Sequence, residues 1–433
     1  MIKWMQHHRK GILIWFICFV LLSSFIYWNN PDRMITITLG TYVGSPWDVP
    51  DANSYRLLDS IIKKFEKDNP TIKVKYESGI AKSDYSSWLS DHIVQGQQPD
   101  VFVIPDDDFN LLLSTQALNN LGRIIKEDHF DKNIYFDSAI DAGVVNNNVY
   151  ALPFSSNPVM MCVNMDILNK EGITIPSHWT IEDFYRICKE VTKDTDHDGV
   201  IDQFGQCDYS WKDIIAGYGI SLFNKEGTKS YFNSSKVKKA LSLFSKICQL
   251  NKNIKVSSED FDKGKVAFMP MTLAQYRTYK PYPYRVAKYS TFSWNCRSMP
   301  ASTSAASYQM KTAMLGLSSR SSHKQSAWKF MKMLCSNLKV QQLILEESQG
   351  ASPVREVMND NRTDQLFKKN GFGSSELSAQ SINMIMDETI AYPKFKKYTK
   401  VMELADYLVL RSLNNKSLDT DLSSIHQSIQ KEL

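Results

Sequence analysis

The sequence predicts an α/β protein of two lobes, each a mainly parallel sheet flanked by helices, after an N-terminal transmembrane anchor. Three observations support this prediction. The chain has 433 residues, more than one hydrophobic core usually organises. Strand-type and helix-type patterns alternate along residues 35–105, which favours β-α-β units with parallel pairing. Residues 11–28 form an apolar run without a charged residue, long enough to cross a hydrocarbon core of roughly 30 Å.

The composition is that of a folded protein with no strong charge bias. Hydrophobic residues make up 43% of the chain and charged residues 22%. Of the net charge of +5, Lys3, Arg9, Lys10 and Arg33 against Asp32 contribute +3. The remaining +2 is too small to indicate a nucleic-acid partner, and we expect none.

Residues 1–33 form a basic stub followed by the apolar run. Lys3, Arg9 and Lys10 precede the run, and positive residues keep that end in the cytoplasm, so the rest of the chain is exported. No small-x-small cleavage pattern stands out after Ser23. We therefore expect an uncleaved helix that anchors the protein at the extracellular face of the cell membrane. Secretion after cleavage of a signal peptide is the alternative.

The seven cysteines form no CxxC pair and no metal-finger spacing. Cys162, Cys188 and Cys248 lie in apolar-rich stretches that are typical of buried thiols. One bridge, between Cys207 and Cys296, is compatible with an exported protein, but spacing alone does not fix connectivity.

The exported part begins with alternating strands and helices. Residues 35–42 (ITITLGTY) and 71–77 (TIKVKYE) have period-two patterns typical of half-buried strands. Between them, residues 53–70 place an apolar stripe on one helical face, with Asn53 or Ser54 as the cap and Pro70 after the end. The stripe consists of Leu57, Leu58, Ile61, Ile62 and Phe65.

Further along, residues 101–105 (VFVIP) predict a short buried strand that ends in Asp106, Asp107 and Asp108. Ligands of open α/β sheets gather at the carboxyl ends of strands, so this acidic triplet is a candidate for a binding cleft. A solvated turn and helix cap is the alternative. Amphipathic helices are predicted at residues 180–193, with Thr180 and Asp183 as a capping box, and at residues 326–337 and 418–433.

Residues 150–192 (YALPFSSNPVMMCVNMDILNKEGITIPSHWTIEDFYRICKEVT) resemble the hinge and the first second-lobe elements of extracellular solute-binding proteins of ABC importers, of the sugar-binding type (family 1). Four other segments resemble the same family in the same order. They are residues 61–77 (IIKKFEKDNPTIKVKYE), 99–104 (PDVFVI), 261–269 (FDKGKVAFM) and 326–356 (SAWKFMKMLCSNLKVQQLILEESQGASPVRE). The resemblance spans residues 34–360.

The resemblance implies a class II periplasmic-binding-protein fold whose two lobes close about hinge strands. Lobe 1 would comprise residues 34–149 and 305–349, and lobe 2 residues 150–304 and 350–433. The hinges would lie near residues 150–154, 300–307 and 349–353. The implied function is capture of a solute, expected to be a carbohydrate, and its delivery to ABC permease subunits. We expect a monomer that is not an enzyme and requires no cofactor.

Family position also nominates ligand-binding residues. Sugars need flat apolar faces against their C–H surfaces and fixed polar groups for their hydroxyls. The aromatic candidates are Tyr42, Trp47, Trp211 and Trp294, and the polar candidates are Asp106, Asp107, Asn157 and Arg355. For each aromatic residue, core packing is the alternative. For Arg355, the alternative is an ion pair that locks the lobes.

The stretch KDTDHDGVIDQFG, residues 193–205, resembles the first three quarters of a calcium-binding loop. If Asp194 is position 1, then Asp196, Asp198, the Val200 carbonyl and Asp202 supply oxygen at positions 3, 5, 7 and 9. Gly205 stands at position 12, where a bidentate Glu belongs. A structural calcium ion and an unmetallated turn both remain open, and we expect the loop beside the cleft.

Three other functions remain as alternatives. The solute could be a peptide, a polyamine or a phosphorylated compound. The protein could be an anchored sensory protein that has lost transport. The motifs around Ser60, residues 155–157 and Lys311 mimic the elements of penicillin-interacting acyl enzymes, but Ala313 replaces the required glycine. No zinc-protease, nucleophile-elbow or phosphate-loop motif occurs in the sequence.

Overall fold

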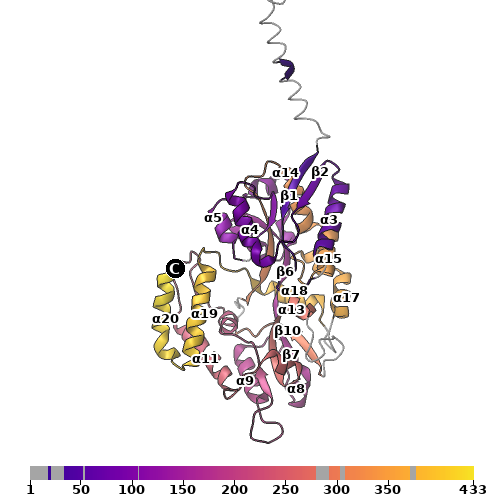
Figure 1. Cartoon of the computed structure of the whole chain (residues 1–433). Helices are drawn as coiled ribbons and strands as arrows, with labels where there is room; N and C mark the ends of the chain where they lie inside the picture. The colour runs from indigo at the N-terminus through magenta and orange to yellow at the C-terminus, as the bar shows by residue number, and fades with distance from the viewer. Residues whose placement is uncertain are drawn as a thin grey trace, which may run out of the picture.

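The computed structural model describes residues 18–20, 34–51, 54–105, 107–278, 292–302, 308–370 and 377–433. These residues form two α/β lobes, one above the other in Figure 1, which confirms the two-lobed prediction. Among the helices of the described residues, none is both long enough and apolar enough to span a membrane. The predicted anchor at 11–28 lies outside the described residues, apart from Cys18–Val20.

Lobe 1 is built on a five-stranded sheet. The order is β2 (Ile72–Tyr76), β1 (Ile35–Gly40), β3 (Val101–Val103), β12 (Lys311–Leu317) and β6 (Ala151–Asn157). β1 pairs in parallel with β2 and β3, as the β-α-β pattern predicts. β12 runs antiparallel to both of its neighbours because it returns from lobe 2.

Helices pack on both faces of this sheet. They are α3 (Ser54–Asp68), α4 (Lys82–Val94), α5 (Phe109–Ser114), α6 (Gly122–Glu127), η1 (Lys132–Ile134), α7 (Asp137–Asp141), α14 (Lys324–Ser336) and α15 (Leu338–Glu347). The predicted stripe of α3 buries Ile61, Ile62 and Phe65, and the Phe65 ring lies 5.0 Å from that of Phe330 on α14. A hairpin of β4 (Val144–Val145) and β5 (Asn148–Val149) follows α7.

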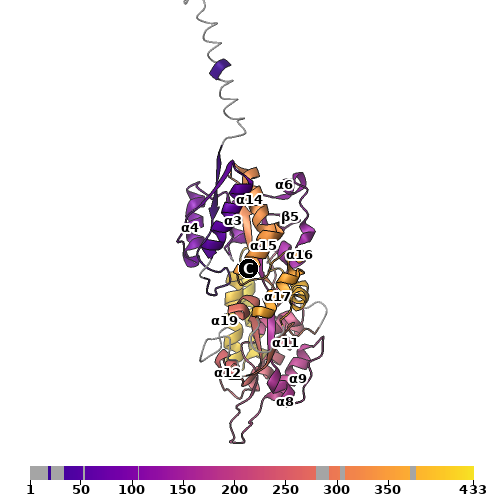
Figure 2. The same ribbon diagram turned by 90° about the vertical axis from the view of Figure 1, so that its right-hand side faces the viewer.

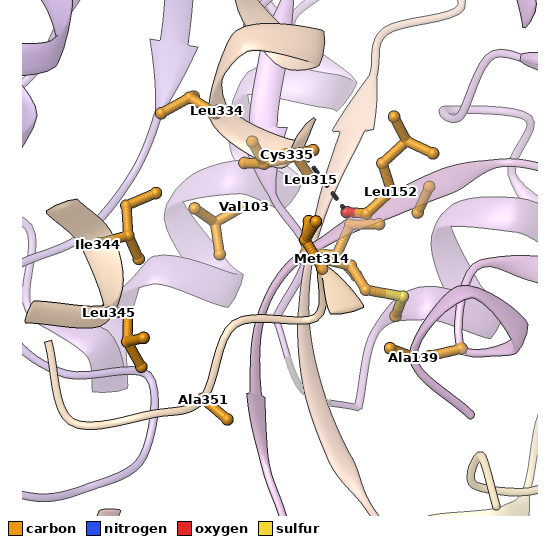
Figure 3. Close-up of a cluster of buried hydrophobic side chains, with 14 of the residues drawn as sticks. Val103, Ala139, Leu152, Met314, Leu315, Leu334, Cys335, Ile344, Leu345 and Ala351 are labelled. Carbon is orange, nitrogen blue, oxygen red and sulfur yellow. Dashed lines mark hydrogen bonds between the residues drawn. The ribbon is translucent and has the colours of Figure 1, made fainter. Parts of the chain in front are cut away.

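The core of lobe 1 lies where α14 and α15 cover the centre of the sheet. Val103 from β3, Leu152 from β6 and Leu315 from β12 are buried there beside Leu334 and Leu345 (Figure 3). The Cys335 thiol approaches the Leu152 carbonyl oxygen at 3.8 Å. Each of these aliphatic side chains contributes on the order of 1.5–3 kcal/mol when it is fully buried, so the centre of the sheet is a stable platform for the loops at its edge.

Lobe 2 has a four-stranded sheet that differs from the prediction. The order is β10 (Trp294–Arg297), β7 (Val159–Asn164), β9 (Val266–Thr272) and β8 (Phe204–Gln206). Only β8 and β9 pair in parallel, while β7 is antiparallel to both β9 and β10. The prediction of a mainly parallel sheet is therefore wrong for lobe 2. The reason is that β7 enters from lobe 1 directly after β6, with no helical crossover that would align it with β9.

The helices of lobe 2 are α8 (Met165–Lys170), α9 (Ile181–Val191), α10 (Trp211–Gly217), α11 (Ser235–Gln249), α12 (Ser258–Asp262), α13 (Leu273–Thr278), α19 (Tyr398–Asn414) and α20 (Leu418–Glu432). The capping box of α9 forms as predicted, between Thr180 and Asp183. α19 and α20 lie side by side along lobe 2 (Figure 1), and α20 buries Ile425 and Ile429 in the core of that lobe.

Three segments connect the lobes, and the first and third differ from the predicted hinges. β6 passes into β7 at Pro158, slightly after the predicted position. The second segment lies between β10 and β12, and its β11 (Tyr308–Gln309) pairs in parallel with β13 (Thr389–Ile390) of the third. The third crossing therefore lies near residues 389–398 instead of 349–353.

The later position of the third crossing changes the boundary of the lobes. α16 (Arg355–Met358) and α17 (Asn361–Asn370) lie beside α15 (Figure 2), α18 (Ala379–Asp387) packs against α16 and α17, and all three share the core of lobe 1. Val357, Met358 and Ile382 are buried in that core. Only the part after β13 belongs to lobe 2, so residues 350–433 are divided between the lobes. β6 also adds residues 151–157 to lobe 1.

All seven cysteines are free thiols in the structure. Cys162 and Cys188 are buried as predicted, whereas Cys248 is exposed because it lies on the outer side of α11. The predicted partner of Cys296 was Cys207, but the Cys296 sulfur lies 3.6 Å from that of Cys162.

Candidate functional site

A cavity of about 950 Å³ lies between the two lobes. Lobe 1 supplies the ends of β3 and β12 and the start of α5, and lobe 2 supplies α10 and the loop after it. The third wall is the segment from β13 into α19. The charged and amide residues that line the cavity include Asp48, Asp107, Asn110, Lys212, Asp213, Asn224, Lys225, Gln309, Lys311, Lys394, Lys396, Glu403 and Asp406.

Asp107 lies on the lobe 1 wall, where the strand β3 ends and the chain turns into α5. Its Oδ1 accepts a hydrogen bond of 2.9 Å from the Thr399 hydroxyl of α19. Three residues further on, the Asn110 side chain donates to the Phe395 carbonyl oxygen at 3.3 Å. Asp107 thus lines the cavity and also joins lobe 1 to the first turn of α19. Its neighbour Asp106 lies outside the described residues.

Lys394 places a cation against the wall of lobe 1. Its ammonium group donates to the carbonyl oxygens of Asp141 and Val144, the latter at 3.1 Å, and lies 5.4 Å from the centre of the Phe109 ring. Burial lowers the pKa of Lys394 to about 8. The segment before α19 is therefore fixed to lobe 1 by a side chain whose charge changes at mildly basic pH.

The lobe 2 wall begins at the N-terminus of α10. Ser210 and Asp213 form a capping box, in which Ser210 Oγ donates to Asp213 Oδ2 at 2.6 Å. Burial raises the pKa of Asp213, although its bonds from Ser210 act in the opposite direction. Lys212 pairs with Asp406 of α19 at 3.3 Å, so α10 and α19 present one connected polar surface to the cavity.

Aromatic rings form the apolar part of the lining. The Phe395 ring packs edge-on against Phe223 and Tyr398, with centroids 5.2 and 5.4 Å apart. Tyr392 is partly exposed in the same segment. Tyr308 is buried and donates its hydroxyl hydrogen to the Pro300 carbonyl oxygen at 2.7 Å. Flat rings between amide and carboxylate groups form a surface that can hold a ligand with both C–H faces and hydroxyl groups.

The four aromatic residues predicted from family position lie elsewhere, and none is among the described residues that line this cavity. Trp211 and Trp294 are each only 1% exposed and pack in the protein core. The Trp211 indole N–H donates to Asp406 Oδ1 at 2.7 Å. Trp211 therefore holds the side chain of Asp406, which lines the cavity, without lining the cavity itself. Tyr42 is buried against Tyr85, with ring centroids 5.1 Å apart.

Trp47 lies at the junction of the lobes, in a small buried cluster with Ala274 and Ala313. Its indole nitrogen has no hydrogen-bond partner among the described residues. Asn157 is also buried at this junction, and its Oδ1 accepts the backbone N–H of Ala274 at 3.0 Å. These two residues connect β6 and the first loop of lobe 1 to α13 of lobe 2.

Arg355 forms its ion pairs within lobe 1. Its guanidinium donates to Asp387 Oδ1 at 2.6 Å and to the Tyr135 carbonyl oxygen at 3.1 Å, and it lies 3.6 Å from Asp137. It also covers the Phe136 ring at 4.4 Å. Arg355 therefore holds α16, α18 and α7 together and does not bridge the lobes.

The acidic loop after α9 lies outside the lining of the cavity. One carboxylate oxygen each from Asp194, Asp196 and Asp198 lies within 4.8 Å of the others. Asp194 accepts the backbone N–H groups of His197 and Gly199, both at 2.7 Å. The Asp202 carboxylate bonds instead to Thr195, at 2.8 Å from its nitrogen and 2.7 Å from its hydroxyl. The Val200 side chain is exposed.

The residues that resemble an acyl-enzyme motif are used structurally. The Ser60 hydroxyl donates to the Leu57 carbonyl oxygen at 2.7 Å within α3. Ser155 lies in β6 opposite Ala313 of β12.

The two-lobed fold with a cavity between the lobes defines a class of proteins that enclose a small ligand. A family model of the bacterial extracellular solute-binding protein matches residues 50–337, which is more than half of the chain. The chain belongs to this family of bacterial extracellular solute-binding proteins.

Individual relatives are more distant. The chain is 26% identical over 173 residues to the galactooligosaccharide-binding protein of Bacillus subtilis (strain 168). This match covers 39% of the chain and 38% of that relative, so it spans well under half the length of either protein.

Two solved structures show the same fold over 92% of the chain. One is an ABC substrate-binding protein from Listeria monocytogenes in complex with cycloalternan, with 20% identity, a TM-score of 0.66 and 99% of that chain covered. The other is the sugar-binding protein MalE from the phytopathogen Xanthomonas citri, with 16% identity, a TM-score of 0.75 and 97% of that chain covered.

Proposed function

We propose that this protein captures a carbohydrate between its lobes and delivers it to the permease subunits of an ABC importer. The observation that carries the proposal is the cavity of about 950 Å³ between the lobes, lined by aromatic rings and by carboxylate and amide groups. A cavity of this size falls in the usual range for small-molecule sites, roughly 300–1,000 Å³. The relatives whose names specify a sugar support the same class of ligand.

Within this site, Asp107 is placed to accept hydrogen bonds from sugar hydroxyls, and Tyr392 offers a partly exposed ring for the C–H face of a sugar. A ligand that contacts both lobes stabilises the closed arrangement only through its differential affinity for that arrangement. Such a ligand would contact lobe 1 at Asp107 and, at Tyr392, the segment that leads from β13 into α19 of lobe 2.

The test is a thermal-shift screen of the exported part of the chain with galactooligosaccharides, maltotriose and cycloalternan, and with peptides and polyamines as non-sugar ligands. A sugar at a hundred times its dissociation constant should add about 2.7 kcal/mol to the free energy of unfolding. A shift with peptides or polyamines and with no sugar would contradict the proposal.

Calorimetric titration of a variant locates the binding site. Tyr392→Ala should weaken sugar binding about tenfold, because loss of a stacking ring on the order of 1.4 kcal/mol corresponds to that ratio. Tyr407→Ala is the matched control, since Tyr407 is an exposed tyrosine of α19 that is not among the described lining residues. Equal affinities of the two variants would place the sugar elsewhere.

We also propose that residues 11–28 hold the protein at the outer face of the membrane, with release after cleavage as the alternative. The support is the sequence: an uncharged apolar run that follows Lys3, Arg9 and Lys10. Membrane fractionation with N-terminal peptide mapping tests this proposal. An intact N-terminus in the membrane fraction is expected, and a soluble product that begins after residue 23 would contradict anchoring.

A further inference from the structure

Cys162 and Cys296 lie directly opposite each other on neighbouring strands of lobe 2. β7 and β10 are antiparallel, and their register pairs Cys296 with Cys162. The two sulfur atoms are 3.6 Å apart. Both side chains are buried, Cys162 completely and Cys296 to all but 7%.

The backbone at this pair has the geometry that a bridge between strands requires. The Met165 N–H donates to the Ser293 carbonyl oxygen at 2.8 Å, so Ser293 and Met165 are a hydrogen-bonded pair, and hydrogen-bonded and non-hydrogen-bonded pairs alternate along the ladder from there to Cys296 and Cys162. Cys162 and Cys296 are therefore a pair without mutual backbone hydrogen bonds, for which the Cα atoms lie about 4.5 Å apart. Disulfides span Cα separations of about 4.4–6.8 Å, so the bond can form without a change of register.

We propose that Cys162 and Cys296 form a disulfide bond in the exported protein. The proposal depends on the extracellular location of the family and not on the identity of the solute. Disulfides persist in oxidising compartments, where a thiol–disulfide oxidant is the co-reactant. Each thiol loses one proton, and the pair transfers two electrons to the disulfide of the oxidant, which leaves as two thiols.

The order of events follows from burial. The thiolate is the attacking species in thiol–disulfide exchange. Burial raises the pKa of the Cys162 thiol well above its ordinary value, so the folded protein holds almost none of that thiolate. The bond therefore forms while the chain folds, before β10 covers Cys162.

The disulfide would fix an edge strand of lobe 2. β10 pairs only with β7 among the described strands, and the chain leaves β10 to cross back toward β12 in lobe 1. A bond at Cys296 fixes the point from which this crossing segment starts. The bond joins residues 134 positions apart in the sequence. A disulfide that closes so long a loop removes more conformational entropy from the unfolded chain than one that closes a short loop.

Peptide mapping of the exported protein tests the bond directly. The full chain is produced in exported form, purified without reductant, alkylated in denaturant and digested with trypsin. Cys162, Cys207 and Cys296 then fall in three separate peptides, residues 133–170, 194–212 and 289–297. We expect a disulfide-linked pair of 133–170 with 289–297. Alkylation of both Cys162 and Cys296, or a link between 194–212 and 289–297, would overturn the proposal.

Thermal unfolding gives a second readout. A reductant should lower the unfolding midpoint of the unmodified protein and of Cys207→Ala by several degrees. It should leave the midpoint of Cys296→Ala unchanged, because that variant has no bond to lose. Cys207→Ala is the matched control, since Cys207 is a third buried thiol of lobe 2. Reductant-independent midpoints for the unmodified protein would contradict a bond that stabilises β10.

Discussion

Asp128 joins the end of α6 to two residues of α14. Its Oδ2 accepts the indole N–H of Trp328 at 3.0 Å and the ammonium group of Lys332 at 2.7 Å. Burial alone would raise the pKa of Asp128, but the hydrogen bonds from Lys332 and Trp328 outweigh it and hold the pKa below its ordinary value. The folded state therefore favours the charged carboxylate.

We predict that Asp128→Asn lowers the free energy of unfolding by about 1 kcal/mol at pH 7, because the pair is partly exposed and its hydrogen bonds are charge-assisted. Because the pKa of Asp128 is lower in the folded state than in the unfolded state, the charged carboxylate stabilises the folded protein at pH values above the unfolded pKa of 3.8. This stabilisation is lost as the pH falls through the folded-state pKa. Urea unfolding between pH 7 and pH 3.5 should show the difference from the unmodified protein shrinking below about pH 4. Asp91→Asn, exposed on α4, is the control.

Individual residues are where the sequence predicts least. It places Trp211 after an acidic loop and Trp294 before the return to lobe 1, but it does not show that both side chains point into the core. The aromatic lining at Tyr392, Phe395 and Tyr398 lies in a stretch whose lysines indicate a solvated face. These three aromatic residues are spaced three apart in the sequence. That spacing does not show that they line a cavity, because they reach it only through the third crossing between the lobes, near β13.

The loop of residues 194–202 is a candidate calcium site that lies outside the lining of the cavity. Its Asp194, Asp196 and Asp198 oxygens lie within 4.8 Å of one another, and Gly199 has φ +93°, which glycine adopts without strain. Calcium binding here stays a prediction. Since Asp202 bonds to Thr195, the loop itself offers an incomplete oxygen shell.

If the loop binds calcium, millimolar calcium should raise the unfolding midpoint of the unmodified protein and not that of Asp196→Ala. Binding should be weak, with a dissociation constant on the order of 10⁻⁴–10⁻³ M, as in extracellular calcium-binding modules. Differential scanning calorimetry with calcium, and with magnesium in its place, measures the effect. Identical midpoints with and without calcium would identify the loop as an unmetallated turn.

Whole elements are predictable when periodicity and caps agree. The sequence predicts α3, α9, α14 and α20 within a few residues because each has an apolar stripe, and the beginning of α9 is also marked by its capping box. The direction of strands in lobe 2 was not predictable in this way. The apolar runs of β7 and β9 carry no information on whether the chain reaches the sheet through a helix or directly from another lobe.

At the scale of the molecule, α19 and the segment before it hold the lobes together through Asp107, Asn110 and Lys394. We predict that Thr399→Val, which removes the hydrogen bond to Asp107, shifts the population toward more open molecules. Loss of about 1 kcal/mol corresponds to about a fivefold change in the open-to-closed ratio.

Small-angle X-ray scattering without ligand should show a larger radius of gyration for Thr399→Val than for the unmodified protein. Thr420→Val is the control, because the Thr420 hydroxyl donates to Ser417 and Asp421 at the start of α20, within lobe 2. If scattering from the two variants is the same, the contact at Asp107 does not control the separation of the lobes.

The division of each lobe between distant stretches of chain also affects biosynthesis. The interior of lobe 2 needs Ile425 and Ile429 of α20, and that of lobe 1 needs Ile382 of α18, long after the first strands of either lobe have been made. Neither lobe can reach its final packing while the ribosome is still adding these helices. The nascent chain therefore lacks the complete core of either lobe until α18 and α20 have been made.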